Sequence, residues 1–103
     1  MSKRRVVITG LGIVSPVGIG VAENWASITA GRGGITRVTH FDATGYPSMI
    51  AGEVKGFDAS HILDRKEVRR TDRYIQFALV CARQALDDAG LPGRLFDAGA
   101  FVW

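Results

Sequence analysis

The hydrophobic pattern is densest near the start of the chain, where apolar residues and glycines fill most positions between 5 and 14. A nearly unbroken apolar run, rich in β-branched residues, is typical of a strand that is buried on both faces of a parallel or mixed sheet. We therefore predict a central strand from Arg5 to about Val14. The next residues, Ser15 to Gly20, contain a proline and two glycines, and we expect them to form a loop.

The pattern after this loop changes to the period of a helix. A short helix is expected over 21–30, with one apolar face and with Gly31 just beyond its end; the face comprises Val21, Trp25 and Ile28. Residues 39–48 contain turn-forming residues and are expected to be a loop. A short strand over Met49–Val54 follows, although Gly52 weakens it. Asp58 or Ser60 is expected to cap a short helix that begins near His61.

The strongest helix signal runs from Asp72 to Ala89, where apolar residues form two stripes that together surround the middle of the helix. The first stripe comprises Ile75, Ala78, Leu79, Ala82, Leu86 and Ala89, and the second comprises Tyr74, Phe77, Cys81 and Ala85. Such a pattern predicts a helix buried between layers. Gly90 is expected to end it in a left-handed conformation. A last apolar run, Ala98–Trp103, is expected to be another buried strand.

Composition limits the class of protein. The 103 residues, 47% hydrophobic and 22% charged, are typical of one small globular unit rather than of a disordered segment. No apolar run approaches the ~18 residues of a membrane span, and no secretory signal precedes the first strand. One cysteine cannot form an internal disulfide, which fits the cytoplasm. The net charge of +3 does not by itself indicate nucleic acid.

The glycines after the first strand call for a test against nucleotide-binding motifs. Gly10 and Gly12 occupy two of the three glycine positions of G-x-G-x-x-G, but Ser15 stands at the third and Pro16 follows it. No Gly-Lys-Ser/Thr of a phosphate-binding loop is present. We therefore interpret the glycines as shaping the strand exit. A Rossmann-type oxidoreductase stays an alternative that NAD(P) binding would revive.

Five basic residues cluster between positions 65 and 73, namely Arg65, Lys66, Arg69, Arg70 and Arg73. On one continuous helix, at about 100° per residue, they would lie within an arc of roughly 140°. Such a stripe is either an ordinary solvated face or a surface that attracts an acidic partner. No interleaved aromatic residues accompany it, which disfavours nucleic acid as the partner.

The residues that most often carry catalysis form no convincing site. Cys81 lies among apolar neighbours in the middle of the expected helix, where a packed core cysteine is the simpler interpretation than a reactive thiol. His40 and His61 are isolated, and with one distant cysteine they make no metal-ligand spacing. Asp87 and Asp88 point about 100° apart on a helix and are interpreted as a solvated end.

Several short stretches together resemble the N-terminus of the beta-ketoacyl-acyl carrier protein synthase family. They are Arg4–Gly18, Trp25, Ala30-Gly31, Gly34-Ile35, His40-Phe41-Asp42 and the basic run Asp64–Gln76. The resemblance covers residues 2 to about 91 and is nearest to synthase II, the elongating enzyme. Polyketide ketosynthases open in much the same way, so they stay an alternative.

The resemblance implies an α/β fold, the N-terminal part of a thiolase-like fold in which helices pack a mixed sheet. Residues 1–103 would be one portion of that domain, without an internal boundary and incomplete as a domain; a truncation, a frameshift or a partial gene would each explain this. It also implies fatty-acid chain elongation by decarboxylative Claisen condensation. No metal or bound cofactor is implied, because the phosphopantetheine of the acyl carrier protein brings the acyl and malonyl thioesters. A non-catalytic subunit similar to a chain-length factor is the other alternative.

The resemblance also assigns roles to particular residues. It implies that Lys66, Arg69 and Arg70 dock the acidic acyl carrier protein, and the helical geometry above adds Arg65 and Arg73 to that stripe. The family's catalytic Cys-His-His motifs match no residue of this chain, so no catalytic, cofactor-binding or metal-binding residue is assigned. We expect the 103 residues alone to be inactive and the full-length enzyme to be a homodimer.

Overall fold

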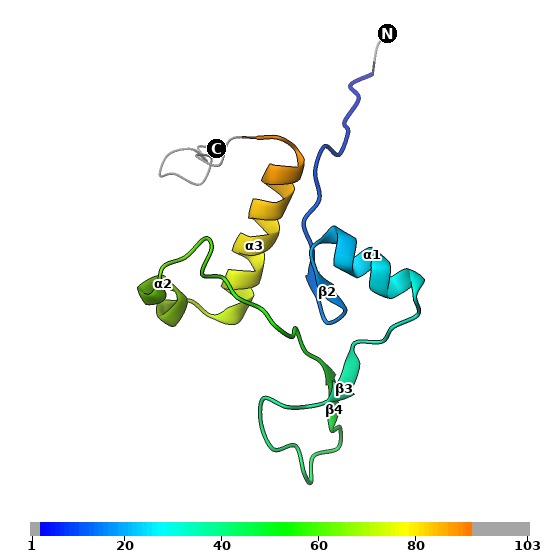
Figure 1. Cartoon of the computed structure of the whole chain (residues 1–103), viewed down its shortest axis with the longest axis vertical. Helices are drawn as coiled ribbons and strands as arrows, with labels where there is room; N and C mark the ends of the chain where they lie inside the picture. The colour runs from blue at the N-terminus through cyan, green and yellow to red at the C-terminus, as the bar shows by residue number, and fades with distance from the viewer. Residues whose placement is uncertain (1–2, 92–103) are drawn as a thin grey trace.

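Residues 3–91 are the part of the chain that this computed structural model describes, and they contain three helices and four short strands (Figure 1). In chain order they are β1 Val14–Ser15, β2 Gly18–Ile19, α1 Val21–Thr29, β3 Ile35–Arg37, β4 Ile50–Gly52, α2 Arg65–Arg70 and α3 Arg73–Asp88. The strands form two separate antiparallel pairs, β1 with β2 and β3 with β4. The strand predicted over 98–103 lies outside the described residues.

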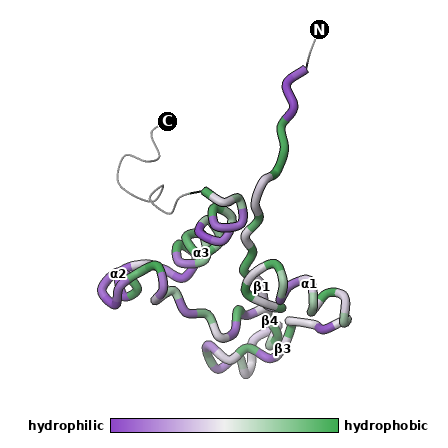
Figure 2. The backbone as a smooth tube through the Cα atoms, turned by 45° about the horizontal axis from the view of Figure 1, so that its top comes forward, coloured by the Kyte–Doolittle hydropathy of each residue, from purple (hydrophilic) through white to green (hydrophobic). Residues whose placement is uncertain are grey.

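The N-terminal segment, residues 3–13, is extended but joins no sheet within residues 3–91, so the prediction of a paired strand from Arg5 to Val14 was wrong for this part of the chain. A strand needs a neighbour that pairs with its N–H and C=O groups, and β1 and β2 pair only beyond this segment. Its apolar side chains are open to solvent, with Val6 93% and Ile8 81% exposed. Figure 2 shows this apolar stretch projecting from the rest of the chain.

Two glycines bring the end of this segment against α3. An added Cβ on Gly12 would collide with the backbone carbonyl oxygen of Cys81, and one on Gly10 would collide with that of Ala85. Beside them, the Leu11 amide donates to Asp88 Oδ2 at 3.0 Å and the Ile13 amide donates to Gln84 Oε1 at 2.9 Å. The two glycines therefore permit close packing of chain on helix.

The predicted loop over 15–20 is a tight hairpin, and the predicted helix over 21–30 is confirmed as α1. The predicted apolar face is not the one turned inward, because Trp25 is 66% and Ile28 59% exposed, whereas Asn24 is buried. Asn24 Nδ2 donates to the carbonyl oxygens of Gly18 and Gly20 at 3.0 and 2.8 Å. Polar bonds to the hairpin thus decide which face of α1 turns inward.

The second hairpin joins β3, which the sequence pattern did not predict, to β4 within the predicted strand Met49–Val54. The loop between them, predicted over 39–48, is anchored by Glu53. Its carboxylate is buried and accepts hydrogen bonds from the Thr39 hydroxyl, at 2.8 Å, and from the amides of Thr39 and His40. Burial alone would raise the pKa of Glu53, but these hydrogen bonds outweigh it and hold the pKa below its ordinary value.

The predicted helix near His61 was wrong: residues 60–62 form a turn, and the next helix begins at Arg65. Asp58 accepts from the amide and hydroxyl of Ser60, so it closes a local turn and does not cap a helix. The long helix was predicted well. α3 ends one residue before Ala89, and Gly90 follows with a φ of 74°.

The described residues do not close a hydrophobic core of their own. Their radius of gyration is 17.3 Å, against about 13 Å for a compact domain of this length. Among residues 3–91 the buried hydrophobic side chains are Ala43, Ala59 and Val80. The prediction that α3 lies between layers was therefore wrong for this part of the chain, because too few described segments cover it. No helix of residues 3–91 is long and apolar enough to cross a membrane.

Candidate functional site

The basic run predicted as a docking surface begins with a well-defined helix start. Asp64 is the N-cap of α2, and its Oδ1 accepts from the Glu67 amide at 2.8 Å. An aspartate at the N-cap accepts a hydrogen bond from an amide that would otherwise lack a partner. Its negative charge also interacts favourably with the positive end of the helix dipole. The cap therefore explains why a helix of only six residues starts at Arg65.

The run is not one continuous helix, so the condition under which all five cations would share one arc is not met. Thr71 has φ −104° and ψ 139°, Asp72 is likewise extended, and α3 starts afresh at Arg73. The Thr71 amide and hydroxyl both donate to the Glu67 carbonyl oxygen, at 3.0 and 2.8 Å, and close the end of α2. The break separates Arg73 from the other four cations.

Those four cations remain together on α2 and are exposed; we call Arg65, Lys66, Arg69 and Arg70 the basic surface. At about 100° per residue they span an arc of roughly 140°. None of them forms an ion pair with a carboxylate of residues 3–91. Four like charges without an internal partner create a positive potential that attracts an acidic molecule. Figure 2 shows α2 as a markedly hydrophilic part of the tube.

Arg73 makes its contacts with residues outside this surface. Its Nη2 donates to the Val54 carbonyl oxygen at 3.3 Å, and its guanidinium lies 5.5 Å from the ring centroid of Phe57 and 5.2 Å from that of Phe77. The two rings meet edge to face at 4.8 Å. Arg73 therefore ties the chain before α2 to the start of α3 through cation–π contacts. Arg73, which the helical spacing added to the stripe, therefore lies on α3 and not with the four cations of α2.

A buried glutamine fixes the angle between α2 and α3; we call the junction at Thr71–Asp72 the elbow. Gln76 is 7% exposed, and its Nε2 donates to the carbonyl oxygens of Val68 and Thr71, at 3.0 Å each, and to the Thr71 hydroxyl oxygen. One side chain on α3 thus satisfies the carbonyl groups at the open end of α2. The basic surface is held in a defined orientation as a result.

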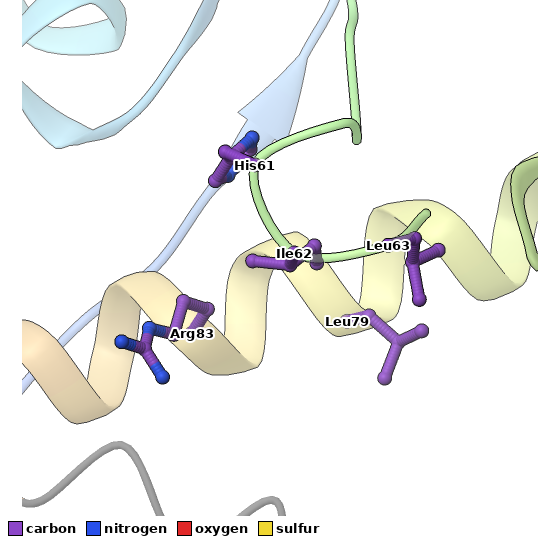
Figure 3. Close-up of a pocket in the computed structure, with 5 residues that line it drawn as sticks. All are labelled: His61, Ile62, Leu63, Leu79 and Arg83. Carbon is purple, nitrogen blue, oxygen red and sulfur yellow. The ribbon is translucent and has the colours of Figure 1, made fainter. Parts of the chain in front are cut away.

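A cavity of about 380 Å³ lies where the turn at residues 61–63 crosses the middle of α3 (Figure 3). His61, Ile62 and Leu63 contribute to it from the turn that crosses α3, and Leu79 and Arg83 contribute from α3 itself. Arg83 pairs with Asp87, with an Nε–Oδ1 distance of 3.4 Å. The turn that lines this cavity ends at Leu63, directly before the N-cap of α2.

The remaining candidate residues stay apart from one another. His40 lies on the β3–β4 loop, with its Nε2 3.5 Å from Glu53 Oε2, and His61 lines the cavity. Cys81 is partly exposed on α3. Within residues 3–91, no group of three or more His, Cys, Asp or Glu side chains could hold a metal ion. Asp88 was interpreted as a solvated end and in fact binds the Leu11 amide.

The sequence interpretation missed two features of this site. Gln76 sits in an apolar stretch and was not singled out, although a polar residue at such a place often has a buried partner. The break at the elbow also had a signal, because Thr71 and Asp72 are residue types that favour helix caps. No comparable signal indicated the cavity, which is formed by residues 61–63 and 79–83 coming together in space.

Comparison with known proteins gives a consistent assignment. The family described as "Beta-ketoacyl synthase, N-terminal domain" matches residues 3–102. The chain is 52% identical over 91 residues to 3-oxoacyl-acyl-carrier-protein synthase 2 of Coxiella burnetii, which is 88% of this chain and 22% of that protein. It is 46% identical over 91 residues, with the same two shares, to the protein of that name from Vibrio cholerae.

Polyketide proteins also match. The tetracenomycin polyketide synthase ketoacyl synthase beta subunit of Streptomyces glaucescens is 51% identical over 86 residues, 84% of this chain and 21% of that subunit. Among solved structures, the ishigamide ketosynthase/chain length factor superposes with a TM-score of 0.78 at 40% identity, covering 88% of this chain and 23% of that one. The predicted ketosynthase fold class is thereby confirmed. The chain spans about a fifth of the length of the curated relatives that it matches.

Proposed function

Since the chain belongs to the beta-ketoacyl synthase family, we propose that it contributes framework and a carrier-protein docking surface to a 3-oxoacyl-acyl-carrier-protein synthase. The relatives named as such synthases match nearly all of the described residues, and the family match extends to residue 102. On the resemblance and the single cysteine, we further propose a cytoplasmic homodimer for the intact enzyme.

The proposed reaction lengthens an acyl thioester by two carbons. A cysteine thiolate attacks the acyl carbonyl, and the carrier thiol leaves. Malonyl-carrier protein then loses carbon dioxide, and the resulting enolate attacks the enzyme-bound acyl group, which releases the cysteine and forms the 3-oxoacyl thioester. Hydrogen-bond donors stabilise the oxyanions that develop in these steps. No residue of this chain is assigned to these steps, because Cys81, His40 and His61 do not match the family's catalytic motifs.

The part that we assign to this chain is the docking of the carrier. The observation that supports it is the basic surface, whose predicted members Lys66, Arg69 and Arg70 are exposed on α2 and unpaired among the described residues. The cap at Asp64 and the bonds from Gln76 hold this surface rigidly. A rigid, exposed cluster of one charge sign accelerates encounter with an oppositely charged protein and fixes its orientation.

Charge reversal tests this proposal in the complete protein that contains residues 1–103. Arg69→Glu/Arg70→Glu is expected to raise the KM for acyl carrier protein thioesters by roughly tenfold to a hundredfold, since electrostatic steering changes association rates by that order. The kcat with a small pantetheine thioester should not change, because the substitutions leave the reaction chemistry intact. Arg37→Glu, which makes half of that charge change at an exposed position of β3, is the control for charge reversal away from α2.

A double variant that used carrier thioesters like the wild type would overturn the docking role. The same assay on residues 1–103 alone is expected to show no condensation, because the chain has no residue assigned to catalysis. Measurable 3-oxoacyl product from this chain would contradict that expectation.

A non-catalytic subunit is the second candidate. The 51% identity to the tetracenomycin beta subunit and the likeness to the ishigamide ketosynthase/chain length factor support it. Such a subunit would share the framework but lack the cysteine nucleophile. Sequencing the gene beyond residue 103 decides between the two candidates, because the synthase requires the Cys-His-His motifs there.

A further inference from the structure

We propose that Arg73 is a positioning residue for the basic surface. It joins the two ends of residues 58–72, which we call the α2 segment, and so fixes the direction in which the cations of α2 point. This inference rests on the proposed function and makes it more specific. It gives Arg73 an effect on docking that acts through the position of α2 and needs no contact between Arg73 and the carrier.

The two ends of the α2 segment meet at Arg73. Phe57 directly precedes the segment and Arg73 directly follows it, and the guanidinium carbon lies 5.5 Å from the centroid of the Phe57 ring. The Phe77 centroid lies 5.2 Å from the same carbon, and the two rings meet edge to face. Arg73 also donates to the Val54 carbonyl oxygen at 3.3 Å. One side chain therefore holds the chain that enters the segment against the helix that follows it.

The α2 segment depends on few contacts for its orientation. None of the six residues of α2 is buried, and the bonds of Asp64 and Thr71 to Glu67 lie within the segment. Gln76 holds the end of α2, and the turn at 61–63 lies against α3. A surface loop whose ends are close together opens and closes as a unit. The contact that closes its ends therefore affects every residue that it carries.

The chemistry of an arginine suits a contact of this kind. A guanidinium group is planar and permanently charged, so it can lie near two aromatic rings and still donate a hydrogen bond. Arg73 forms no ion pair with a carboxylate of residues 3–91. If Arg73 positions α2, the effect of its charge passes through the Phe57 ring. A residue that touched the carrier would act without Phe57, and this difference can be measured.

The test is a double-mutant cycle in the complete protein with Arg73→Gln, Phe57→Leu and both together. Each single variant is expected to raise the KM for acyl carrier protein thioesters about two- to fivefold, since apparent affinity falls with the fraction of molecules that are correctly oriented. The kcat with a small pantetheine thioester should not change. The double variant should do no more than the larger single change, because both substitutions remove one contact. Arg37→Gln, an equal loss of charge at an exposed position of β3, is the matched control.

Hydrogen exchange gives a second readout that does not need the carrier. Arg73→Gln and Phe57→Leu should each speed exchange at the amides of residues 58–72 about two- to fivefold, while amides in the centre of α3 keep their wild-type rates. Unchanged exchange in residues 58–72 would overturn the inference. Faster exchange with a wild-type KM would also overturn it, because Arg73 would then affect stability and not docking.

The cycle separates positioning from direct contact. If Arg73→Gln raised the KM and Phe57→Leu did not, or if the two effects added, Arg73 would act on the carrier through its own charge and the inference would fail. A wild-type KM for Arg69→Glu/Arg70→Glu would instead remove the proposed docking function itself. A normal response to that charge reversal together with an additive cycle would exclude the role of Arg73 alone.

Discussion

The N-terminal segment and the elbow show two different ways in which this chain acquires structure. Residues 3–13 have the stronger local preference, because their apolar run predicts a strand, yet they form no sheet within the described residues and expose Val6 and Ile8. The elbow has a mixed and highly charged sequence, yet Asp64 accepts from the Glu67 amide, and Thr71 and Gln76 donate to carbonyl oxygens at the end of α2.

The difference follows from where the partners of each backbone group lie. The backbone groups of a helix bond to one another, and only those at its ends need capping. Residues close by in sequence supply the caps at the elbow. A strand needs a neighbour from elsewhere in the fold. The basic surface therefore sits on the region that is capped locally, whereas the extended segment keeps its place through bonds to α3 and, at Ile13, through a bond from the Gly20 amide.

The largest effect is expected from Gly12→Ala, which breaks the contact that holds the extended segment. The added methyl group would collide with the Cys81 carbonyl oxygen and crowd Gln84, two parts of α3. Overpacking of this kind costs typically about 1–3 kcal/mol, and a backbone neighbour that cannot rotate away favours the upper end. Urea unfolding of the complete protein measures the loss.

Gly33→Ala is the matched control, because a Cβ there would meet no atom within 4 Å and its φ is not in the left-handed region. It should change the free energy of unfolding by less than about 0.5 kcal/mol. Equal stabilities for the two variants would mean that the segment does not depend on close packing against α3.

A smaller effect is expected at the elbow from Gln76→Leu. The leucine keeps a similar bulk but leaves the Val68 and Thr71 carbonyl oxygens without their donor, which costs about 1–3 kcal/mol for buried groups and less where water can reach them. We expect faster hydrogen exchange at the amides of α2, and a higher KM for the carrier with an unchanged kcat for a small thioester.

The exchange pattern separates a local role from a general one. If Gln76 positions the basic surface, amides in α2 should lose protection while those in the centre of α3 keep it. Uniform loss of protection across both helices, or none, would contradict a positioning role for this side chain.

The sequence predicted the helical parts of the fold better than the strands, for a physical reason. α1 and α3 were located to within one or two residues because their periodicity and their glycine ends are local signals. The pairing of β3 with β4 depends on residues about 15 apart in sequence, and no turn signature connects them. The exposure of Trp25 could not be predicted either, since it depends on what covers α1.

The candidate site was predictable in its chemistry but not in its shape. The cluster of cations was visible in the sequence, and three of its members were assigned from a family resemblance. The loss of Arg73 from the stripe arises from its contacts with Phe57 and Phe77, and Phe57 lies 16 positions away. Spacing along one ideal helix cannot include a break that Thr71 and Gln76 stabilise together.

The smallest effect is expected from pH, and it concerns the other locally completed region, the β3–β4 loop. Hydrogen bonds from Thr39 and His40 outweigh the effect of burial and lower the pKa of Glu53 from its ordinary value of 4.5. A carboxyl group whose pKa is lower in the folded state than in the unfolded state stabilises the fold at pH values above the unfolded-state pKa. This contribution is lost as the pH falls below about 4.5 and through the lower folded pKa.

Glu53→Gln isolates this contribution, because the amide has a similar shape but does not titrate. Asp42 and Asp58 also have lowered pKa values, owing to hydrogen bonds from Thr44 and from Ser60, so the wild type should lose stability in acid through several groups. The variant should be less stable than the wild type at pH 7, and the difference should shrink as the pH falls below 4.5. A constant difference across this range, measured by urea unfolding at each pH, would show that the loop is held by packing and not by the ionised carboxylate.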